Sequence, residues 1–311
     1  MIRVAPLDKG FSSGSFIVIA TIALGAVVTG CDRGPTPSEA EAVVAEPAFD
    51  PVRFDEGLLA IETWLEDGRP EEAERIARRL VQLDPDSLDA LEAHGRCLMI
   101  IAAMSRREGR GDGIEEEEEA LERYRAVIEQ SGDDPLPAHL HAAGLAAQAC
   151  GAFEEALSFH VRGDDLEPGN PQHAIFAGNI HTRMGRPGPA REWFVRATEI
   201  DPREPWGWAG IAECHRQESD WAAALEAIRS ARERAPESTG FRVSEARILR
   251  ESGSPEQAAM LLFAIPEEDR ATPAVTRELA TACTLIGEHR RAAAAWGELH
   301  RRNPGDHDSA L

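Results

Sequence analysis

A repeat of 34 residues is the feature of this sequence that most restricts its fold. Three prolines recur at that spacing, Pro168, Pro202 and Pro236, and each follows two stretches with the composition of helices. A fixed period of this length is typical of repeat proteins, in which each unit packs only on its neighbours. The chain is rich in Ala and Leu and short of β-branched residues after position 50, so we expect helical units.

Small and large residues recur at fixed places within each unit. Unit 171–204 carries Gly178, Gly185, Ala190, Phe194 and Ala197 before its proline. This order resembles the tetratricopeptide repeat, in which small residues, a turn glycine, a large residue and a late proline follow one another in this way. The resemblance implies two antiparallel helices per unit. The small residues would let these helices approach, and the large residue would fill the space under the next unit.

Seven consecutive units cover residues 54–306. They are 54–87, 88–136, 137–170, 171–204, 205–238, 239–272 and 273–306. Unit 88–136 is longer than the others, and its excess is predicted to be a loop between its helices at 105–119. In unit 239–272, Pro266 is expected to end the second helix a turn early, and in unit 205–238, Ser219 stands where Gly is usual. The predicted fold is an all-α solenoid, a right-handed superhelix of about seven helix-turn-helix units.

The charge balance excludes several classes of function. The formal net charge is −22, whereas a protein that binds nucleic acid needs a basic surface to neutralise phosphates. Lys9 is the only lysine, so the chain has no phosphate-binding loop that ends in Lys and no Schiff-base lysine in its repeats. We therefore expect no nucleic acid, no small-molecule substrate and no cofactor.

The first 31 residues have the pattern of an export signal. Arg3 and Lys9 precede an apolar run over 16–29, which is shorter than the roughly 20 residues that a membrane-spanning helix needs. The run ends in Val28-Thr29-Gly30-Cys31, which resembles the lipobox of bacterial lipoproteins. The resemblance implies that residues 1–30 are a signal peptide, removed when Cys31 receives its lipid. An uncleaved signal anchor is the alternative.

Residues after the cysteine suggest how the protein is held at a membrane. Residues 31–53, rich in Pro and Glu, are predicted to be a disordered tether behind the lipidated cysteine. Asp32 follows the cysteine directly, and in some lipoproteins Asp at that place retains the protein in the inner membrane. The expected location is the periplasmic or extracytoplasmic face of the membrane. An uncleaved anchor at 11–29 could also leave the body facing the cytoplasm. Residues 307–311 are expected to be a short tail.

Several motifs suggest a site but have simpler explanations. The tripeptide Arg110-Gly111-Asp112 resembles an integrin-binding motif and is interpreted as a coincidence. The run Glu115–Glu119 suits the start of a helix, where carboxylates face the positive end of the helix dipole, although it could bind cations or a basic partner. His139 and His141 lie two residues apart on different helix faces and are poor joint ligands. The sequence therefore predicts no metal site and no catalytic residue.

The remaining histidines and cysteines of the repeats are predicted to be packing residues. His181 and His215 occupy the same position in successive units, where the family has an aromatic residue. Four cysteines lie in separate units, and we expect buried thiols there in preference to disulfides. These cysteines are Cys97, Cys150, Cys214 and Cys283.

A set of residues on the first helices is predicted to line a partner-binding groove. In the repeats that this sequence resembles, five positions of the first helix face the groove. Those positions include Asn179, Arg183, Trp206, Arg216, Arg247 and Arg250. A row of arginines would suit an acidic peptide, and Trp206 would add an apolar anchor. The alternative is that Glu213 and Glu251 neutralise the arginines within the array. Ile175 replaces the lysine of the family's clamp for chaperone tails, so that class of ligand is not expected.

The combined features predict a lipid-anchored scaffold for protein–protein interaction, and not an enzyme. The resemblance to bacterial repeat lipoproteins suggests a role in envelope, secretion or pilus assembly, with a protein or peptide as partner. The alternative is an accessory or catalytic subunit of an envelope enzyme, such as the partner of a glycosyltransferase or peptidase. Repeats fill nearly all of 54–306, which leaves little room for a catalytic domain.

Overall fold

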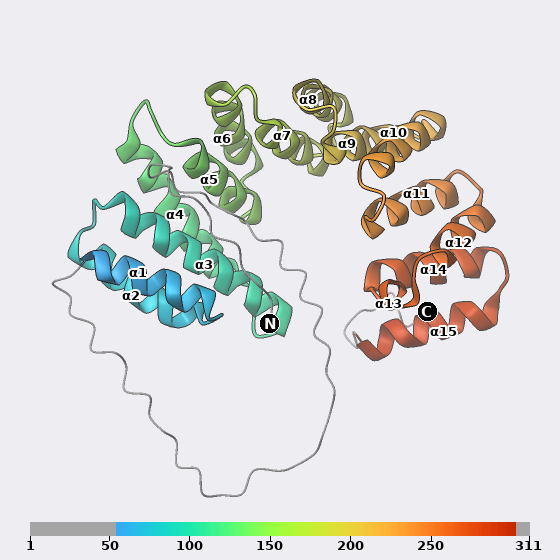
Figure 1. Ribbon diagram of the computed structural model, residues 1–311, viewed down its shortest axis with the longest axis horizontal. Helices are drawn as coiled ribbons and strands as arrows, with labels where there is room; N and C mark the ends of the chain where they lie inside the picture. The colour runs from blue at the N-terminus through green and yellow to red at the C-terminus, as the bar shows by residue number, and fades with distance from the viewer. Residues whose placement is uncertain (1–53, 303–311) are drawn as a thin grey trace, which may run out of the picture. The chain divides into compact units, whose positions relative to one another are not determined.

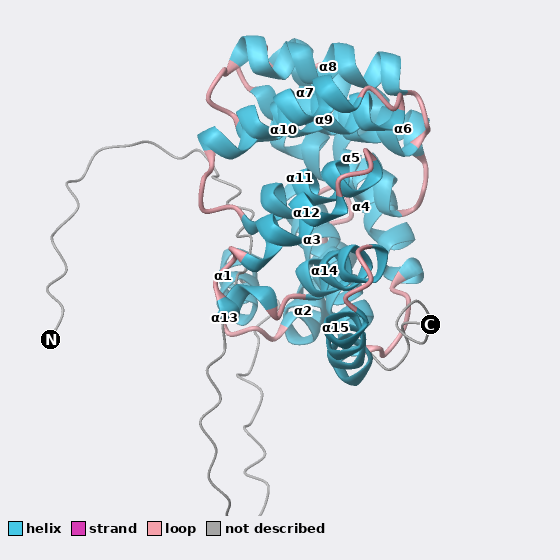
Figure 2. Ribbon diagram, turned by 90° about the vertical axis from the view of Figure 1, so that its right-hand side faces the viewer, coloured by secondary structure: helices cyan, strands magenta, loops and turns pink. Residues whose placement is uncertain are grey.

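The computed structural model describes residues 54–302, and all regular secondary structure in that range is helical (Figures 1 and 2). The helices are α1 (Phe54–Glu66), α2 (Pro70–Leu83), α3 (Leu88–Glu108), α4 (Ile114–Ser131), α5 (Pro137–Ala149), α6 (Phe153–Leu166), α7 (Pro171–Arg183), α8 (Pro187–Ile200), α9 (Pro205–Gln217), α10 (Trp221–Arg234), α11 (Thr239–Glu251), α12 (Pro255–Phe263), α13 (Glu267–Arg270), α14 (Pro273–Leu285) and α15 (His289–Arg302). The predicted signal peptide, Cys31, the predicted tether and the predicted tail 307–311 lie outside the described residues.

The helices form seven hairpins that stack in chain order. The hairpins are α1–α2, α3–α4, α5–α6, α7–α8, α9–α10, α11–α12 and α14–α15, and the first helix of each begins at the first residue of a predicted unit. Each hairpin packs on the next, and first helices of neighbouring hairpins touch as well, as α7 does with α9 and α11 with α14 (Figure 1). The all-α solenoid fold is thus confirmed. No helix among the described residues is both long and apolar enough to cross a bilayer.

Local sequence signals explain where the helices begin and turn. Proline occupies the first turn of α2, α5, α7, α8, α9, α12 and α14, where its missing N–H would have no partner anyway. Asn170 caps α7 by accepting a hydrogen bond from the backbone N–H of Gln172, and Asp220 caps α10 through the N–H of Ala223. The turn inside each standard hairpin contains a residue of positive φ, which is Gly except for Ser219 at φ 60°.

The core follows the predicted alternation of small and large residues. Phe194 is 1% exposed and lies between the backbones of α7 and α9. A Cβ atom on Gly178 would lie 2.7 Å from the Phe194 ring, and one on Gly210 would overlap that ring. The two glycines therefore create the space that the phenylalanine fills, as the repeat pattern implies.

The predicted loop at 105–119 is wrong in extent. Helix α3 continues to Glu108 and α4 already begins at Ile114, so only residues 109–113 connect them. The extra length of unit 88–136 is mostly helix, because α3 has 21 residues and α4 has 18. Arg106 near the end of α3 pairs with Glu117 in the first turn of α4, and this contact holds the two extended ends together. The glutamate run is a helix start, as expected.

The irregular unit and the cysteines follow the sequence analysis more closely. Helix α12 ends at Phe263, ahead of Pro266, and the short α13 follows. All four cysteines of the repeats are free thiols, and three of them are fully buried while Cys150 is half-buried. Burial raises the pKa of the Cys97 thiol to about 12 and that of Cys214 to about 11, so both stay protonated and pack as small apolar groups.

Candidate functional site

The predicted groove residues lie on the first helices α7, α9 and α11. Asn179 and Arg183 belong to α7, Trp206 opens α9, and the other three arginines lie on α9 and α11. Helix α7 touches α9 and α11 touches α14, while side-chain contacts from Arg216 to Glu251 and from Trp206 to Phe241 link α9 to α11. We call these first helices the groove layer. The structure brings Arg216, Arg247 and Arg250 into one charged network and leaves the other three residues to separate surroundings.

Arg216 is the centre of that network. Its Nε and Nη2 each donate a hydrogen bond of 2.7 Å to Glu213 on the same helix, and its Nη1 donates one of 2.8 Å to Glu251 on α11. These hydrogen bonds raise the pKa of Arg216 above its ordinary value. Burial by itself raises the pKa of the Glu213 carboxyl, but the hydrogen bonds from Arg216 and Gln217 outweigh it and leave that pKa lowered.

The network continues from α11 to α14. Arg250 donates hydrogen bonds to Glu278 of α14 and, at 3.2 Å, to Glu251. Arg247 lies farther from its partner, with 3.7 Å between its Nε and an oxygen of Glu278. Three arginines thus face three glutamates, which are Glu213, Glu251 and Glu278. Carboxylates of the array therefore neutralise the arginines, as the alternative interpretation of the sequence predicted. The three arginines do not form an unpaired positive surface.

A small pocket opens beside this network, between α9, α10 and α11. It is lined by buried apolar side chains and by charged groups of both signs. The lining residues are Ala209, Ala212, Glu213, Arg216, Ile228, Ser244, Arg247 and Ile248. Arg247 is the most accessible of the three arginines, with 47% of its side chain exposed, against 23% for Arg216 and 19% for Arg250. An incoming carboxylate would therefore meet Arg247 first.

The other predicted groove residues have their own surroundings. Trp206 is 59% exposed and packs edge-on against Phe241 of α11, with 5.0 Å between the ring centroids. The Arg183 guanidinium lies over the ring of Phe153, 4.7 Å from its centroid, on the side of the preceding hairpin. Asn179 is exposed. Only Trp206 has the apolar, accessible surface that the groove prediction assigns to it.

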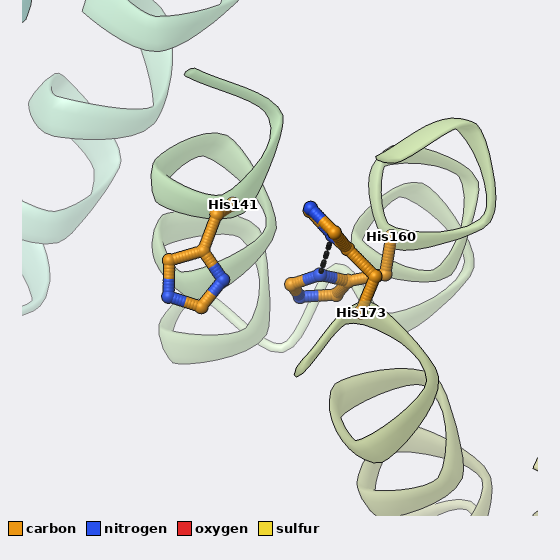
Figure 3. Close-up of side chains that lie close together, drawn as sticks. All are labelled: His141, His160 and His173. Atoms are coloured by element: carbon orange, nitrogen blue, oxygen red, sulfur yellow. Dashed lines mark hydrogen bonds between the residues drawn. The ribbon is translucent and has the colours of Figure 1, made fainter. Parts of the chain in front are cut away.

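A cluster of three histidines was missed by the sequence analysis. His141 on α5, His160 on α6 and His173 on α7 each place one ring nitrogen within 4.8 Å of the other two (Figure 3). The sequence analysis considered His141 only with His139, which instead bonds Glu92 at 3.1 Å. Each member occupies a routine packing or surface position of its own repeat unit, so the helical spacing offered no signal. Only the packing of three successive helices brings them together.

Comparison with known proteins supports the fold and nothing finer. No family model matches the sequence, and neither does any curated protein. Among solved structures, the chain is similar to a tetratricopeptide repeat protein from Parabacteroides merdae, with a TM-score of 0.63 and 13% identity over 83% of this chain and 96% of that one. It is similar to the assembly chaperone of RpL4, Acl4, with a TM-score of 0.54 and 18% identity over 79% of this chain and 100% of that one.

A third similar structure is the APC/C hetero-tetramer Cut9–Hcn1, with a TM-score of 0.59 and 14% identity. The match covers 84% of this chain but 48% of the other, so this chain spans about half the length of that neighbour. At these identities the likeness concerns the fold alone. The hairpins, their register and these neighbours agree, and the chain has the helix-hairpin fold of tetratricopeptide repeats.

Proposed function

We propose that this protein is a scaffold that binds a protein or peptide partner on the layer formed by α7, α9, α11 and α14. The observation that carries the proposal is the pocket between α9 and α11, where buried apolar side chains lie next to Arg247. Two structural neighbours carry names that state protein association, namely the chaperone of RpL4 and the Cut9–Hcn1 hetero-tetramer. Helical repeat arrays offer extended surfaces of the kind that such partners need.

The chemistry of the pocket indicates the kind of segment that fits it. Ala209, Ala212 and Ile248 would accept an aliphatic side chain, while Arg247 would accept a carboxylate next to it. The contact between Arg247 and Glu278 is long, at 3.7 Å, and 47% of the Arg247 side chain is exposed. A partner carboxylate can therefore displace Glu278 at small cost. Trp206 adds an exposed aromatic surface at the start of α9, the helix that also carries Ala209 and Ala212.

A crosslinking experiment tests this surface directly. A photoreactive amino acid at Ser244, which lines the pocket, should capture a partner in intact cells, whereas the same amino acid at Arg203, in the exposed connection before α9, should not. The charge reversal Arg247→Glu should abolish the Ser244 product, while Arg203→Glu should leave it. Equal products at both positions, or insensitivity to Arg247→Glu with the protein folded, would remove the pocket from the binding surface.

We further propose that the array is held at a membrane by lipid on Cys31, on the extracytoplasmic side, in support of envelope, secretion or pilus assembly. The lipobox-like Val28–Cys31 and the apolar run before it support this part of the proposal. Incorporation of labelled palmitate that is lost in Cys31→Ser would support it. Incorporation unchanged by that substitution would refute it. Asp32 favours the inner membrane, which fractionation of the labelled protein tests.

The proposed role is binding and not catalysis, because helix hairpins account for the described chain from Phe54 to Arg302. A role as the subunit of an envelope enzyme is the remaining alternative. It predicts that the partner captured at Ser244 is a glycosyltransferase or a peptidase, and mass spectrometry of the crosslinked product distinguishes the two roles.

A further inference from the structure

The three clustered histidines come from three successive helices that pack at the boundary between two repeat units. His141 and His160 belong to the hairpin α5–α6, and His173 opens the next hairpin on α7 (Figure 3). Two glycines provide the space for the rings. A Cβ atom on Gly144 would overlap the ring of His160, and one on Gly163 would overlap the ring of His173. The absence of side chains at these two glycines therefore leaves room for the imidazole rings at this boundary.

The distances match those of a three-histidine metal site. Nδ1 of His160 lies 3.4 Å from Nδ1 of His173, and a ring nitrogen of His141 lies within 4.8 Å of both rings. With metal–nitrogen bonds of about 2.0–2.1 Å, tetrahedral geometry requires about 3.3–3.4 Å between ligand nitrogens. One pair already has that separation. The third ligand needs to approach by roughly an ångström, which a small rotation of the half-exposed His141 ring can supply.

The protein satisfies the imidazole nitrogens of His160 only in part. Nδ1 of His160 faces Nδ1 of His173, while its Nε2 is buried without a hydrogen-bond partner in a side chain that is 0% exposed. With Nδ1 as the metal ligand, Nε2 carries the ring proton. Outside the cluster, the buried His94 and His139 are each bonded to a glutamate, at 3.0 and 3.1 Å.

The walls around the cluster are aromatic on one side and acidic on the other. The ring of Phe176 stacks on His160, with 5.1 Å between centroids, and meets His141 edge-on at 4.7 Å. Burial lowers the pKa of His173, although Glu167 and Asp164 lie near it and act in the opposite direction. One oxygen of Asp164 pairs with Arg196 while its buried Oδ1 has no partner. The carboxylate of Glu167 adds a negative charge near these rings, which favours a cation at this place.

We propose that His141, His160 and His173 bind one divalent transition-metal ion of the Zn²⁺ class, and that the ion joins α5, α6 and α7. Imidazole ligands suit Zn²⁺, Cu²⁺ and Ni²⁺, and three of them leave a fourth position for water or for a group from a partner. A bound ion would fasten the third hairpin to the fourth. The site also adds a partner contact that is independent of the pocket between α9 and α11.

Metal titration of the full chain tests the proposal. The protein is stripped with a chelator and titrated with Zn²⁺ by calorimetry, and with Co²⁺ by absorption spectroscopy. We expect one Zn²⁺ per chain with a Kd of about 1 μM or below, a Co²⁺ spectrum of tetrahedral type, and a melting temperature that rises with Zn²⁺ concentration. Failure to bind Zn²⁺ with a Kd below about 100 μM would overturn the proposal.

Two substitutions separate ligation from packing. His160→Phe keeps a ring at a position where the repeat normally has a large side chain, and His141→Phe alters the least buried member. Each should weaken Zn²⁺ binding at least about 100-fold, since even outer-shell partners contribute 10- to 100-fold. The control is His181→Phe, a buried histidine of α7 outside the cluster. Binding that is unchanged in both cluster variants, or lost equally in the control, would refute the assignment. Circular dichroism establishes that each variant is folded.

Discussion

Arg216 on α9 and Glu251 on α11 are joined by a 2.8 Å hydrogen bond between Nη1 and Oε2, although they are 35 positions apart in the sequence. Because that separation is about one repeat, the bond connects equivalent helices of neighbouring hairpins. Arg250 then connects α11 to Glu278 of α14 in the same manner. The charged side chains of the groove layer thus form ion pairs that connect neighbouring units.

The first prediction concerns the interaction energy between Arg216 and Glu251. We expect a double-mutant cycle of Arg216→Gln and Glu251→Gln to give a coupling of roughly 1 kcal/mol, the upper end for partly exposed pairs. Urea unfolding followed by circular dichroism measures it. The matched control is the cycle of Arg69→Gln and Glu72→Gln, a more exposed pair within one hairpin, which should couple by about 0.5 kcal/mol or less. Equal coupling in both cycles would contradict a role for the bond between units.

The fold was predictable because the repeat signal is redundant. Each unit restates the same order of small and large residues, so the helix starts at Pro137, Pro171, Pro205 and Pro273 follow from the period alone. The exception is unit 88–136, where three glycines suggested a long loop. In the structure, α3 instead continues to Glu108. The ion pair of Arg106 with Glu117 holds the extended ends of α3 and α4 together. The glycines correctly indicated where the connection lies, but the predicted connection was too long.

The site was less predictable, because it depends on side chains one repeat apart. The sequence placed Arg216 and Glu251 on the groove layer and left open whether the arginine faces a partner or the glutamate. Rotamers and the spacing of α9 and α11 decide that question, and neither is visible in a periodic pattern. The histidine cluster was hidden for a similar reason. His141, His160 and His173 occupy unrelated positions of their units, and only the packing of α5, α6 and α7 relates them.

The second prediction concerns acid. The pKa of Glu213 is lowered in the folded protein from its ordinary value of 4.5, so the unfolded chain binds its proton more readily. The stability that Glu213 contributes is therefore complete well above pH 4.5 and is lost as the pH falls through the folded pKa. We expect the difference in unfolding free energy between wild type and Glu213→Gln to shrink over that range. With 35% of the side chain exposed, the difference should be about 1 kcal/mol or less.

Urea unfolding of both proteins at several pH values measures that difference, and it cancels the titration of all other groups. A difference that grows as the pH falls would contradict the assigned direction of the Glu213 pKa.

The third prediction tests the short connection between α3 and α4. Gly109 and Gly113 both have positive φ, 68° and 72°, but a Cβ on Gly113 would lie 2.8 Å from the backbone of Ala102, whereas one on Gly109 meets nothing within 4 Å. We expect Gly109→Ala to cost about 1 kcal/mol for the left-handed conformation. Gly113→Ala should cost a further 1–3 kcal/mol or so for the overlap. Chemical denaturation of the two variants gives the comparison, and equal losses would show that the connection can move away from α3.

The last prediction concerns the one turn inside a described hairpin that lacks glycine. Ser219 has φ 60°, and its N–H bonds the Arg216 carbonyl at 3.0 Å, while the next N–H bonds His215 at 2.9 Å. Gly185 in the preceding hairpin has φ 69° and makes the same pair of bonds, at 3.0 and 2.9 Å. The two turns therefore differ in side chain and not in hydrogen bonding.

A left-handed residue with a Cβ is strained by roughly 1–2 kcal/mol, and glycine gives back about 0.4–1 kcal/mol through the freedom of the unfolded chain. Ser219→Gly should accordingly stabilise the protein by about 0.5–1 kcal/mol, from the difference of those two quantities. The reciprocal change, Gly185→Ser, should destabilise it by a similar amount, since nothing lies within 4 Å of that position to add a clash. Urea midpoints of both variants against wild type provide the measurement. A loss in Gly185→Ser without the matching gain in Ser219→Gly would mean that the strain at Ser219 is relieved by its own surroundings.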